Sequence, residues 1–198
     1  MGNGNHQAHT NVMTYERIDN SKKFDGRTRE SHELRYKIAS NFIGNKDIVL
    51  DAGCGTGYGR EILKPYLVYI GYDKNILRKK DTKKYTFIKH DFEWESPETI
   101  TGWFIPNWPV DVFVGLEIIE HLNDTDATFL MFKRISPKLI ILSTPHLKCP
   151  IGGNKFHYRH YGMDELIDSF WNIGYKPKRA ELIYFGAGLC NFMVMGRR

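Results

Sequence analysis

Short apolar runs alternate with segments of helical periodicity along most of this chain. Runs such as residues 48–50 and 112–114 have no polar residue between their apolar ones, which is typical of buried parallel strands. Strands that alternate with helical segments predict an α/β fold built on one doubly wound, mostly parallel sheet. The expected strands lie at 48–50, 68–70, 85–88, 112–114, 139–142, 182–184 and 192–194.

Apolar residues at helical spacing predict the helices between these strands. In residues 31–42 the stripe consists of Leu34, Ile38 and Phe42, and Gly44 follows in the position that favours a left-handed cap. Further helices are expected over 58–63, around Phe129, Phe132 and Ile135, and around Leu166, Phe170 and Ile173, the last ending at Gly174.

The domain organisation is simple. The chain has 198 residues, 41% of them hydrophobic, which is enough for one domain with a sizeable core. Residues 1–12, rich in Asn, Gly and His, have no periodicity and are expected to form a flexible tail. Residues 13–198 are expected to form a single domain without an internal repeat or a linker.

The charge balance is basic, with a formal net charge of +5 and a pI of about 9.0. A basic cluster either meets a polyanion or is an ordinary solvated helix face. The cluster consists of Lys74, Arg78, Lys79, Lys80, Lys83, Lys84 and Lys89.

Targeting and redox features predict a soluble protein of the cytoplasm with no membrane partner. No apolar run reaches the roughly 18 residues of a membrane-spanning helix, and the amino terminus lacks the apolar centre of a secretory signal. The cysteines Cys54, Cys149 and Cys190 are far apart, with no CxxC pair. They predict neither a disulfide framework nor a thiolate zinc site, and they fit a reducing compartment.

A glycine-rich turn follows the first strand and carries the most informative pattern. Its glycines are Gly53, Gly55 and Gly57, and such turns bring backbone amides close to a ligand. The dinucleotide fingerprint GxGxxG fails because Tyr58 stands where its last glycine is required, which disfavours a dehydrogenase. Asp51 opens the turn and would repel a pyrophosphate but attract an ammonium or sulfonium group. The turn therefore predicts a positively charged ligand.

Residues 51–57, with the pattern acidic-x-Gly-x-Gly-x-Gly, resemble the first motif of class I S-adenosylmethionine-dependent methyltransferases. The resemblance implies a Rossmann-like, seven-stranded doubly wound sheet, mostly parallel with the last strand antiparallel. It also implies S-adenosylmethionine as the cofactor and an N-terminal helical lid, about residues 13–45, across the cofactor mouth. The cofactor-binding residues that it implies are Asp51, Gly53, Gly55, Gly57, Asp73, Asp91, Phe92 and Glu117.

Some of these assignments have ordinary structural alternatives. Asp73 ends the second strand, where the family uses an acidic residue to accept the ribose hydroxyl protons, but an isolated aspartate there is also a common helix N-cap. Asp91 would face the adenine amino group and Phe92 would pack on the ring, although Phe92 would equally suit the core.

Polar side chains follow the fourth strand, at the edge where open α/β sheets bind ligands. If this segment is helical, Glu117, Glu120 and His121 share one face. Two carboxylates and an imidazole on one face are suited to bind a divalent ion or to supply a general base. Many methyltransferases carry a similar segment that only orients and lines the cofactor pocket. Residues 154–161 are expected to form a substrate-facing loop rather than a helix or a strand.

Methyl transfer from a sulfonium requires alignment of the nucleophile, the methyl carbon and the sulfur. A hydroxyl acceptor must also lose a proton, so a base is needed near the methyl group. The catalytic candidates for this role are His121, His157, His160 and Glu117.

Two branches of the family resemble the chain and differ in their acceptors. Methyltransferases of polysaccharide and small-molecule pathways are similar over nearly all of the chain after Tyr15, which favours a sugar or small metabolite as the acceptor. The small-RNA 3′-terminal 2′-O-methyltransferases are similar to a lesser extent, which makes RNA the alternative acceptor. That branch holds its metal with two glutamates and two histidines, and Glu117, Glu120, His121 and His157 match in type and order. Ligation by oxygen and nitrogen alone favours magnesium or manganese.

An alternative outside the enzymes is an inactive, nucleic-acid-binding scaffold on the same fold. Loss of activity would be expected to disrupt the cofactor motifs. Because the acidic residues and glycines of those motifs are all present, the sequence favours an active enzyme.

Overall fold

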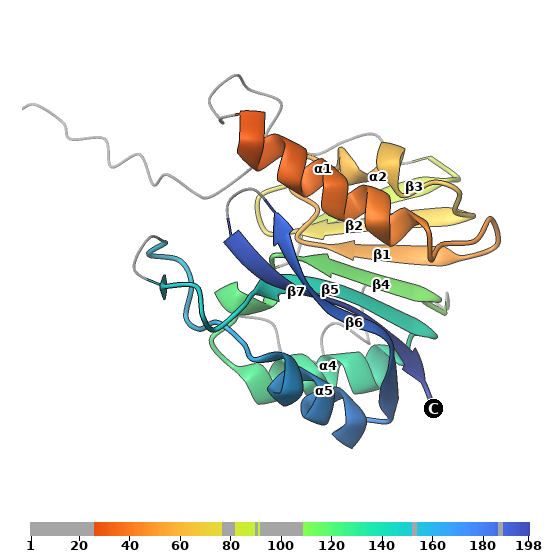
Figure 1. Ribbon diagram of the computed structural model, residues 1–198. Coiled ribbons are helices and arrows are strands. Elements are labelled where there is room, and N and C mark those ends of the chain that lie inside the picture. Colours follow the sequence, from red (N-terminus) through yellow and green to blue (C-terminus); the bar gives the residue numbers. More distant parts are fainter. Residues whose placement is uncertain (1–25, 77–81, 90, 92–108, 152–153, 186–187) are drawn as a thin grey trace, which may run out of the picture.

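The computed structural model describes residues 26–76, 82–89, 91, 109–151, 154–185 and 188–198, which form a sheet with helices on both faces (Figure 1). The strands are β1 (Ile48–Ala52), β2 (Val68–Asp73), β3 (Tyr85–Lys89), β4 (Val112–Leu116), β5 (Leu139–Pro145), β6 (Tyr175–Phe185) and β7 (Gly188–Arg197). The helices are α1 (Gly26–Ser40), α2 (Gly59–Ile62), α4 (Thr125–Ile135), α5 (Met163–Asn172) and the 3₁₀ helix η1 (Ile119–His121).

The seven strands lie in the order β3-β2-β1-β4-β5-β7-β6. Neighbours from β3 to β5 are parallel, whereas β7 is antiparallel to both β5 and β6. The central strands β1, β4 and β5 are almost wholly buried, which explains why their sequences IVLDA, VFVGL and LIILSTP are mostly apolar. The predicted fold class is confirmed, including the antiparallel last strand.

Two apolar layers hold the helices against the sheet (Figure 1). On one face, α1 packs through Tyr36 and Ala39. On the other face, α4 packs through Phe132 and α5 through Phe170, and the Phe132 ring meets that of Phe113 on β4 with centroids 4.9 Å apart. Burial of these aromatic rings fixes the helices that surround the site.

Two glycines were expected to end helices, and only one does so in the left-handed conformation. α5 stops just before Gly174, whose φ of +94° suits glycine, as predicted. α1 already ends at Ser40, and Gly44 is not among the positive-φ residues, so the left-handed cap expected there is wrong. The Gly44 amide instead donates a hydrogen bond to the Asp47 carboxylate at 2.7 Å.

The side of β1 on which strands are added changes after β3. Strands β2 and β3 are added on one side of β1, and β4 returns to the other side. In open parallel sheets such a switch point leaves a crevice at the carboxyl ends of the strands, where ligands bind. The candidate site is therefore expected at the carboxyl ends of β1 and β4.

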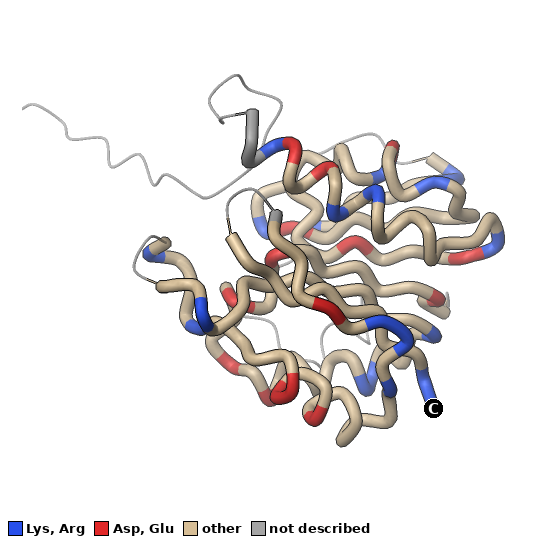
Figure 2. Tube along the Cα trace, in the orientation of Figure 1, with Lys and Arg blue, Asp and Glu red and all other residues tan. Residues whose placement is uncertain are grey.

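Several expectations fall outside the described residues: the tail over 1–12, the part of the lid before residue 26, Phe92, and Arg78, Lys79 and Lys80 of the basic cluster. Figure 2 shows basic and acidic positions intermixed along the described trace. Among the described helices, none has the length and apolar character needed to span a bilayer.

Candidate functional site

A cavity of about 460 Å³ lies at the switch point, where β1, β2, β4 and β5 end. The glycine turn after β1 and the last residue of β2 form one end of its wall. The segment after β4, the loop after β5 and the start of β7 form the other end, and α1 contributes one further side. Segments far apart in the sequence therefore share one cavity.

The glycine turn has backbone conformations that favour glycine. Gly53, Gly55 and Gly57 have φ values of +70°, +56° and +73°. At Gly57 an added Cβ would lie 2.2 Å from Phe87 Cε1. Gly53 and Gly55 line the cavity, whereas Gly57 is not among its described lining residues. The first two face the ligand space, and Gly57 allows the turn to pack against β3.

Asp73, at the end of β2, lines the cavity and is tied to the glycine turn. Its Oδ2 accepts a hydrogen bond from the Gly55 amide at 2.8 Å, and its Oδ1 accepts one from the Asn75 amide at 2.7 Å. Each carboxylate oxygen has further acceptor capacity, so Asp73 can also accept hydrogen bonds from two vicinal hydroxyls. The local turn to Asn75 and a ligand-binding role are therefore compatible.

Asp51 lies behind the glycine turn. It is fully buried, and its Oδ2 accepts hydrogen bonds from the Tyr69 hydroxyl at 2.6 Å and the Tyr36 hydroxyl at 3.2 Å. Burial raises the pKa of Asp51 to about 7, although the two tyrosine hydroxyls act in the opposite direction. Asp51 is not among the described lining residues, so its carboxyl does not face the cavity in which a cationic ligand would lie. Its contacts instead join α1 to β1 and β2.

Replacing Asp51 by Asn should remove a pH dependence of folding stability. The folded-state pKa of about 7 lies above the usual 3.8, so the folded protein retains a proton that the unfolded chain releases as the pH rises. The contribution of the protonated carboxyl is complete below about pH 4 and is lost as the pH approaches 7. The free energy of unfolding of the wild type should therefore fall relative to Asp51→Asn by about 2 to 3 kcal/mol between pH 5 and pH 8.

Urea unfolding followed by circular dichroism at both pH values measures this difference. Asp126→Asn, at an exposed position on α4, is the matched control and should show a constant difference. A constant difference for Asp51→Asn as well would contradict the raised pKa.

Two adenine contacts are expected after β3, from Asp91 and Phe92. Asp91 is partly buried but is not among the described lining residues, and Phe92 lies outside the described part of the chain. Both assignments stay predictions.

Glu117 lines the cavity just after β4 and has a left-handed backbone. Its φ of +56° is a conformation that typically costs a non-glycine residue about 1–3 kcal/mol. Its amide donates to the Ser143 carbonyl at 2.9 Å, and its Oε1 accepts from the Ser143 hydroxyl at 2.8 Å. Because this backbone interrupts helical geometry, only the short η1 follows, and Glu117 does not share a helix face with Glu120 and His121. That sequence-based expectation is corrected here.

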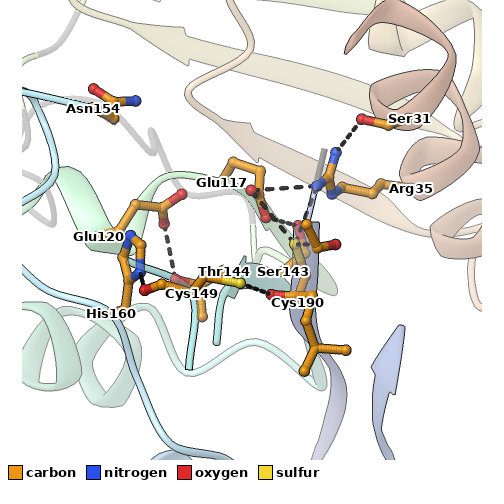
Figure 3. A network of polar contacts seen from close by, with 12 residues as sticks. Ser31, Arg35, Glu117, Glu120, Ser143, Thr144, Cys149, Asn154, His160 and Cys190 are labelled. Atoms are coloured by element: carbon orange, nitrogen blue, oxygen red, sulfur yellow. Dashed lines mark hydrogen bonds and ion pairs between the residues drawn. The ribbon is translucent and has the colours of Figure 1, made fainter. Parts of the chain in front are cut away.

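Helix α1 places a buried cation beside Glu117 (Figure 3). Arg35 Nη2 lies 3.3 Å from Glu117 Oε2, with exposed side-chain fractions of 3% and 16%. Arg35 Nη1 donates to the Ser31 hydroxyl at 3.0 Å, and Nη2 contacts Cys190 Sγ at 3.3 Å. Burial and the charge of Arg35 lower the pKa of His32, on the same helix, to about 3, so His32 is neutral. α1 thus forms a polar wall of the cavity.

A directed chain of hydrogen bonds fixes the protonation of two histidines in the loop after β5. The Cys149 carbonyl can only accept, so His160 Nδ1, 2.9 Å away, carries a proton. Asn154 Oδ1 accepts from the Phe156 amide at 3.0 Å, which leaves Asn154 Nδ2 to donate to His157 Nε2 at 2.8 Å. His157 Nδ1 therefore donates to His160 Nε2, also at 2.8 Å. These hydrogen bonds leave His157 neutral, with its lone pair on Nε2.

His121 packs against this pair. Its Nδ1 donates to the Phe156 carbonyl at 3.1 Å, and its ring lies edge-on to that of His157 with centroids 4.6 Å apart. Burial, together with His121 and His160, lowers the pKa of His157 to about 4, in agreement with the neutral form. The three imidazoles form one cluster in the cavity wall.

Glu120 is the fully buried carboxyl of this cluster. Its Oε2 accepts from the Thr144 hydroxyl at 3.0 Å, while its Oε1 has no hydrogen-bond partner among the described residues. Burial and the nearby Glu117 raise the pKa of Glu120 well above its usual range. Donor atoms of Glu120, His121 and His157 lie within 4.8 Å of one another. Three residues of the predicted metal set thus come together, whereas Glu117 is paired with α1 instead.

Sequence reasoning missed two features of this site. Asn154 orients His157, but no motif marks it, because its role depends on the backbone amide of Phe156. The three cysteines, distant in sequence, all line the cavity. Only the folding of the turn, the loop and β7 onto one crevice brings them near each other.

Sequence comparisons show related proteins. No protein-family model matches the chain. A probable S-adenosylmethionine-dependent methyltransferase of Mycolicibacterium smegmatis is 28% identical over 170 residues, covering 80% of this chain and 63% of that protein. A probable S-adenosylmethionine-dependent methyltransferase of Mycobacterium tuberculosis is 26% identical over 156 residues, covering 73% of this chain and 54% of that protein. The chain therefore spans 63% and 54% of the lengths of these two relatives.

The fold is also that of solved methyltransferases. Magnesium protoporphyrin IX methyltransferase from Synechocystis, with bound S-adenosylhomocysteine, superposes with a TM-score of 0.64 at 16% identity, over 91% of this chain and 90% of that one. The glycine turn after β1 and the related sequences agree with this likeness. In sequence and in fold, the chain is thus similar to S-adenosylmethionine-dependent methyltransferases.

Proposed function

We propose that this protein transfers a methyl group from S-adenosylmethionine to a hydroxyl group of a sugar or another small polar metabolite. The observation that carries the proposal is a single cavity that joins Asp73 and the glycine turn to the histidines after β5. Transfer from a sulfonium requires the donor and acceptor to meet in line within one enclosed space. A cavity with a cofactor end and a proton-accepting end meets this requirement.

At the cofactor end, the glycine backbone leaves room for the methyl donor to approach closely, and a carboxylate can accept hydrogen bonds from it. Gly53 and Gly55 line the cavity without side chains, which leaves room for the donor. Asp73 would accept hydrogen bonds from the two ribose hydroxyls with the acceptor capacity left beside its backbone contacts.

At the acceptor end, His157 Nε2 would take the hydroxyl proton when the acceptor replaces the Asn154 amide at this nitrogen. As the proton moves, the acceptor oxygen bonds to the methyl carbon and the carbon–sulfur bond breaks, which leaves neutral S-adenosylhomocysteine. His160 is a positioning residue, because it accepts from His157 Nδ1 and so keeps the lone pair on Nε2. Glu117 is a poorer base, since a hydroxyl and an ion pair already occupy its two oxygens.

The chemistry of the lining supports a polyhydroxylated acceptor. Asn154, His157 and His160 all line this end of the cavity. Amide and imidazole groups can donate to and accept from hydroxyls, so they suit a sugar better than an apolar molecule.

A second candidate is metal-dependent 2′-O-methylation of RNA, which the grouping of Glu120, His121 and His157 favours. Glu120 Oε1, buried and with no hydrogen-bond partner among the described residues, is a suitable ligand atom. One carboxylate and two imidazoles fit a divalent ion and suit manganese better than magnesium. A bound ion would supply Lewis-acid activation of the acceptor hydroxyl.

Asp73→Ala tests the cofactor end. The substitution should weaken binding of S-adenosylhomocysteine by about 10- to 150-fold, because hydrogen bonds to charged groups contribute about 1.5–3 kcal/mol. Titration calorimetry measures the affinity, and circular dichroism checks that the fold is retained. Asp126→Ala, at an exposed position on α4, is the control. Unchanged affinity would remove Asp73 from the ribose role, and a wild-type protein that does not bind S-adenosylhomocysteine would contradict the proposed activity.

The acceptor class is tested with methyl-labelled S-adenosylmethionine, a set of free sugars and host extract, with and without EDTA. Label in the small-molecule fraction that survives EDTA supports the first proposal. Label that is lost on ribonuclease treatment and is absent with EDTA supports the RNA candidate.

A further inference from the structure

The loop between β5 and α5 projects beyond the sheet and carries exposed apolar side chains beside the cavity (Figure 1). Leu147, Ile151 and Phe156 have no polar side-chain atom, and their exposed fractions are 57%, 42% and 37%. Ile151 directly follows Pro150, which lines the cavity. Phe156 directly precedes His157, which also lines it. The exposed apolar surface therefore begins where the cavity wall ends.

Hydrogen bonds through Asn154 hold Ile151 and Phe156 near each other. The Asn154 amide donates to the Ile151 carbonyl at 3.0 Å, and its Oδ1 accepts from the Phe156 amide at 3.0 Å. The Phe156 carbonyl in turn accepts from His121 Nδ1 at 3.1 Å. Because Asn154 also lines the cavity, one residue joins the cavity wall to both apolar side chains.

The charged residues of this loop are all basic (Figure 2). Residues 146–161 contain Lys148, Lys155 and Arg159 and no Asp or Glu. Arg159 is paired with Glu165 on α5, whereas neither Lys148 nor Lys155 has an ion-pair partner among the described residues. Lys155 Nζ lies 5.0 Å from the centre of the Phe156 ring. A cation is thus available beside the apolar surface.

Three consecutive residues carry three different chemistries from the cavity wall to this surface. The amide of Asn154 can bind hydroxyls, the ammonium of Lys155 can bind a phosphate, and the ring of Phe156 can pack against a hydrocarbon. Single exposed apolar residues are common on proteins, but a group of them beside a cavity is typical of a binding surface. The order of these groups indicates a ligand with the same order of parts.

We propose that the acceptor is an anionic amphiphile: a sugar that carries an aliphatic chain through a phosphate group. The sugar enters the cavity, the phosphate lies at Lys155, and the chain packs on Ile151 and Phe156. This inference rests on the proposed function and names the class of its acceptor. It gives the polar cavity lining and the apolar outside of the loop separate parts of one molecule to bind.

Titration calorimetry with hexyl phosphate and decyl phosphate, each below its critical micelle concentration, tests the surface without methyl transfer. A chain that lies on a surface is covered on one side, so each added CH₂ should strengthen binding about twofold. Decyl phosphate should therefore bind the wild type about 10- to 20-fold more tightly than hexyl phosphate. In the double variant Ile151→Ser/Phe156→Ser the two ligands should bind almost equally. Lys155→Gln should weaken both by the same factor, about 2- to 5-fold.

Matched controls come from α4, where Leu130 is 51% exposed and Lys133 is exposed as well. Leu130→Ser should keep the preference for decyl phosphate, and Lys133→Gln should leave both affinities unchanged. Equal binding of the two ligands by the wild type would overturn the inference. An unchanged preference in the double variant would overturn it too, because the chain would then lie elsewhere. If the double variant does not fold, Phe156→Ser decides by the same criterion.

Methyl transfer separates this inference from the proposed function. Labelled S-adenosylmethionine is supplied with hexose decyl phosphates and with the matching free hexoses. A higher kcat/KM for the decyl phosphates, lost in the double variant, supports the assignment of the acceptor. Equal kcat/KM for both acceptors overturns it and leaves the proposed function standing. Binding of decyl phosphate without transfer to any acceptor contradicts the proposed function, and the assignment of the acceptor falls with it.

Discussion

His157→Gln should lower the rate of methyl transfer by about 10²- to 10⁴-fold at saturating cofactor, the usual contribution of a positioned general base. The amide of Gln can still form hydrogen bonds in the loop, but it cannot take up a proton near neutral pH. Because His157 lies at the acceptor end, the affinity for S-adenosylhomocysteine should stay unchanged. Initial rates with labelled cofactor and calorimetry on the same protein separate the two effects.

Tyr158→Phe is the matched control, since Tyr158 is the next residue and its side chain is 56% exposed. It should retain the wild-type rate. His160→Gln should cause a smaller loss than His157→Gln, because His160 acts only through its neighbour. A His157→Gln protein with wild-type turnover would remove His157 from the catalytic step.

Gly57→Ala should destabilise the fold by about 2–4 kcal/mol, through overpacking and an unfavourable positive φ. The new Cβ would lie 2.2 Å from Phe87 Cε1, and the φ of +73° suits glycine. Strand β3 would have to move away from the glycine turn to relieve this contact. For a domain of this size the melting temperature should fall by about 4–16 °C, which differential scanning calorimetry measures.

Gly44→Ala is the same chemical change at a tolerant position. Its added Cβ would meet the Asp47 carboxylate at 3.4 Å, an ordinary contact with a flexible side chain, and its φ is not positive. The melting temperature should change little. Equal effects of the two substitutions would show that packing of the turn against Phe87 does not limit stability.

The fold could be predicted from sequence because its signal is local. Strands such as β4 and β5 are continuous apolar runs, and the glycines of the turn follow β1 without a gap. The end of α5 was equally predictable, since Gly174 takes the left-handed conformation. At Gly44 the same rule failed, because α1 ends earlier and the amide donates a hydrogen bond to the Asp47 carboxylate.

The site was less predictable because its partners are distant in sequence. The spacing of Glu117, Glu120 and His121 suggested one helix face, but the left-handed backbone at Glu117 turns its carboxylate to Arg35. The position of Asp51 suggested a ligand contact, whereas tyrosines from α1 and β2 surround it. In both cases the deciding partner comes from an element that no local pattern connects to the motif.

Two adjacent residues of α1 attach this helix to two neighbouring strands. Arg35 pairs with Glu117 after β4, and the Tyr36 hydroxyl donates to Asp51 on β1. Both carboxyls would lose a buried partner if this helix moved away from the sheet. Displacing α1 from the cavity would therefore break two buried polar contacts, on two neighbouring strands, rather than one.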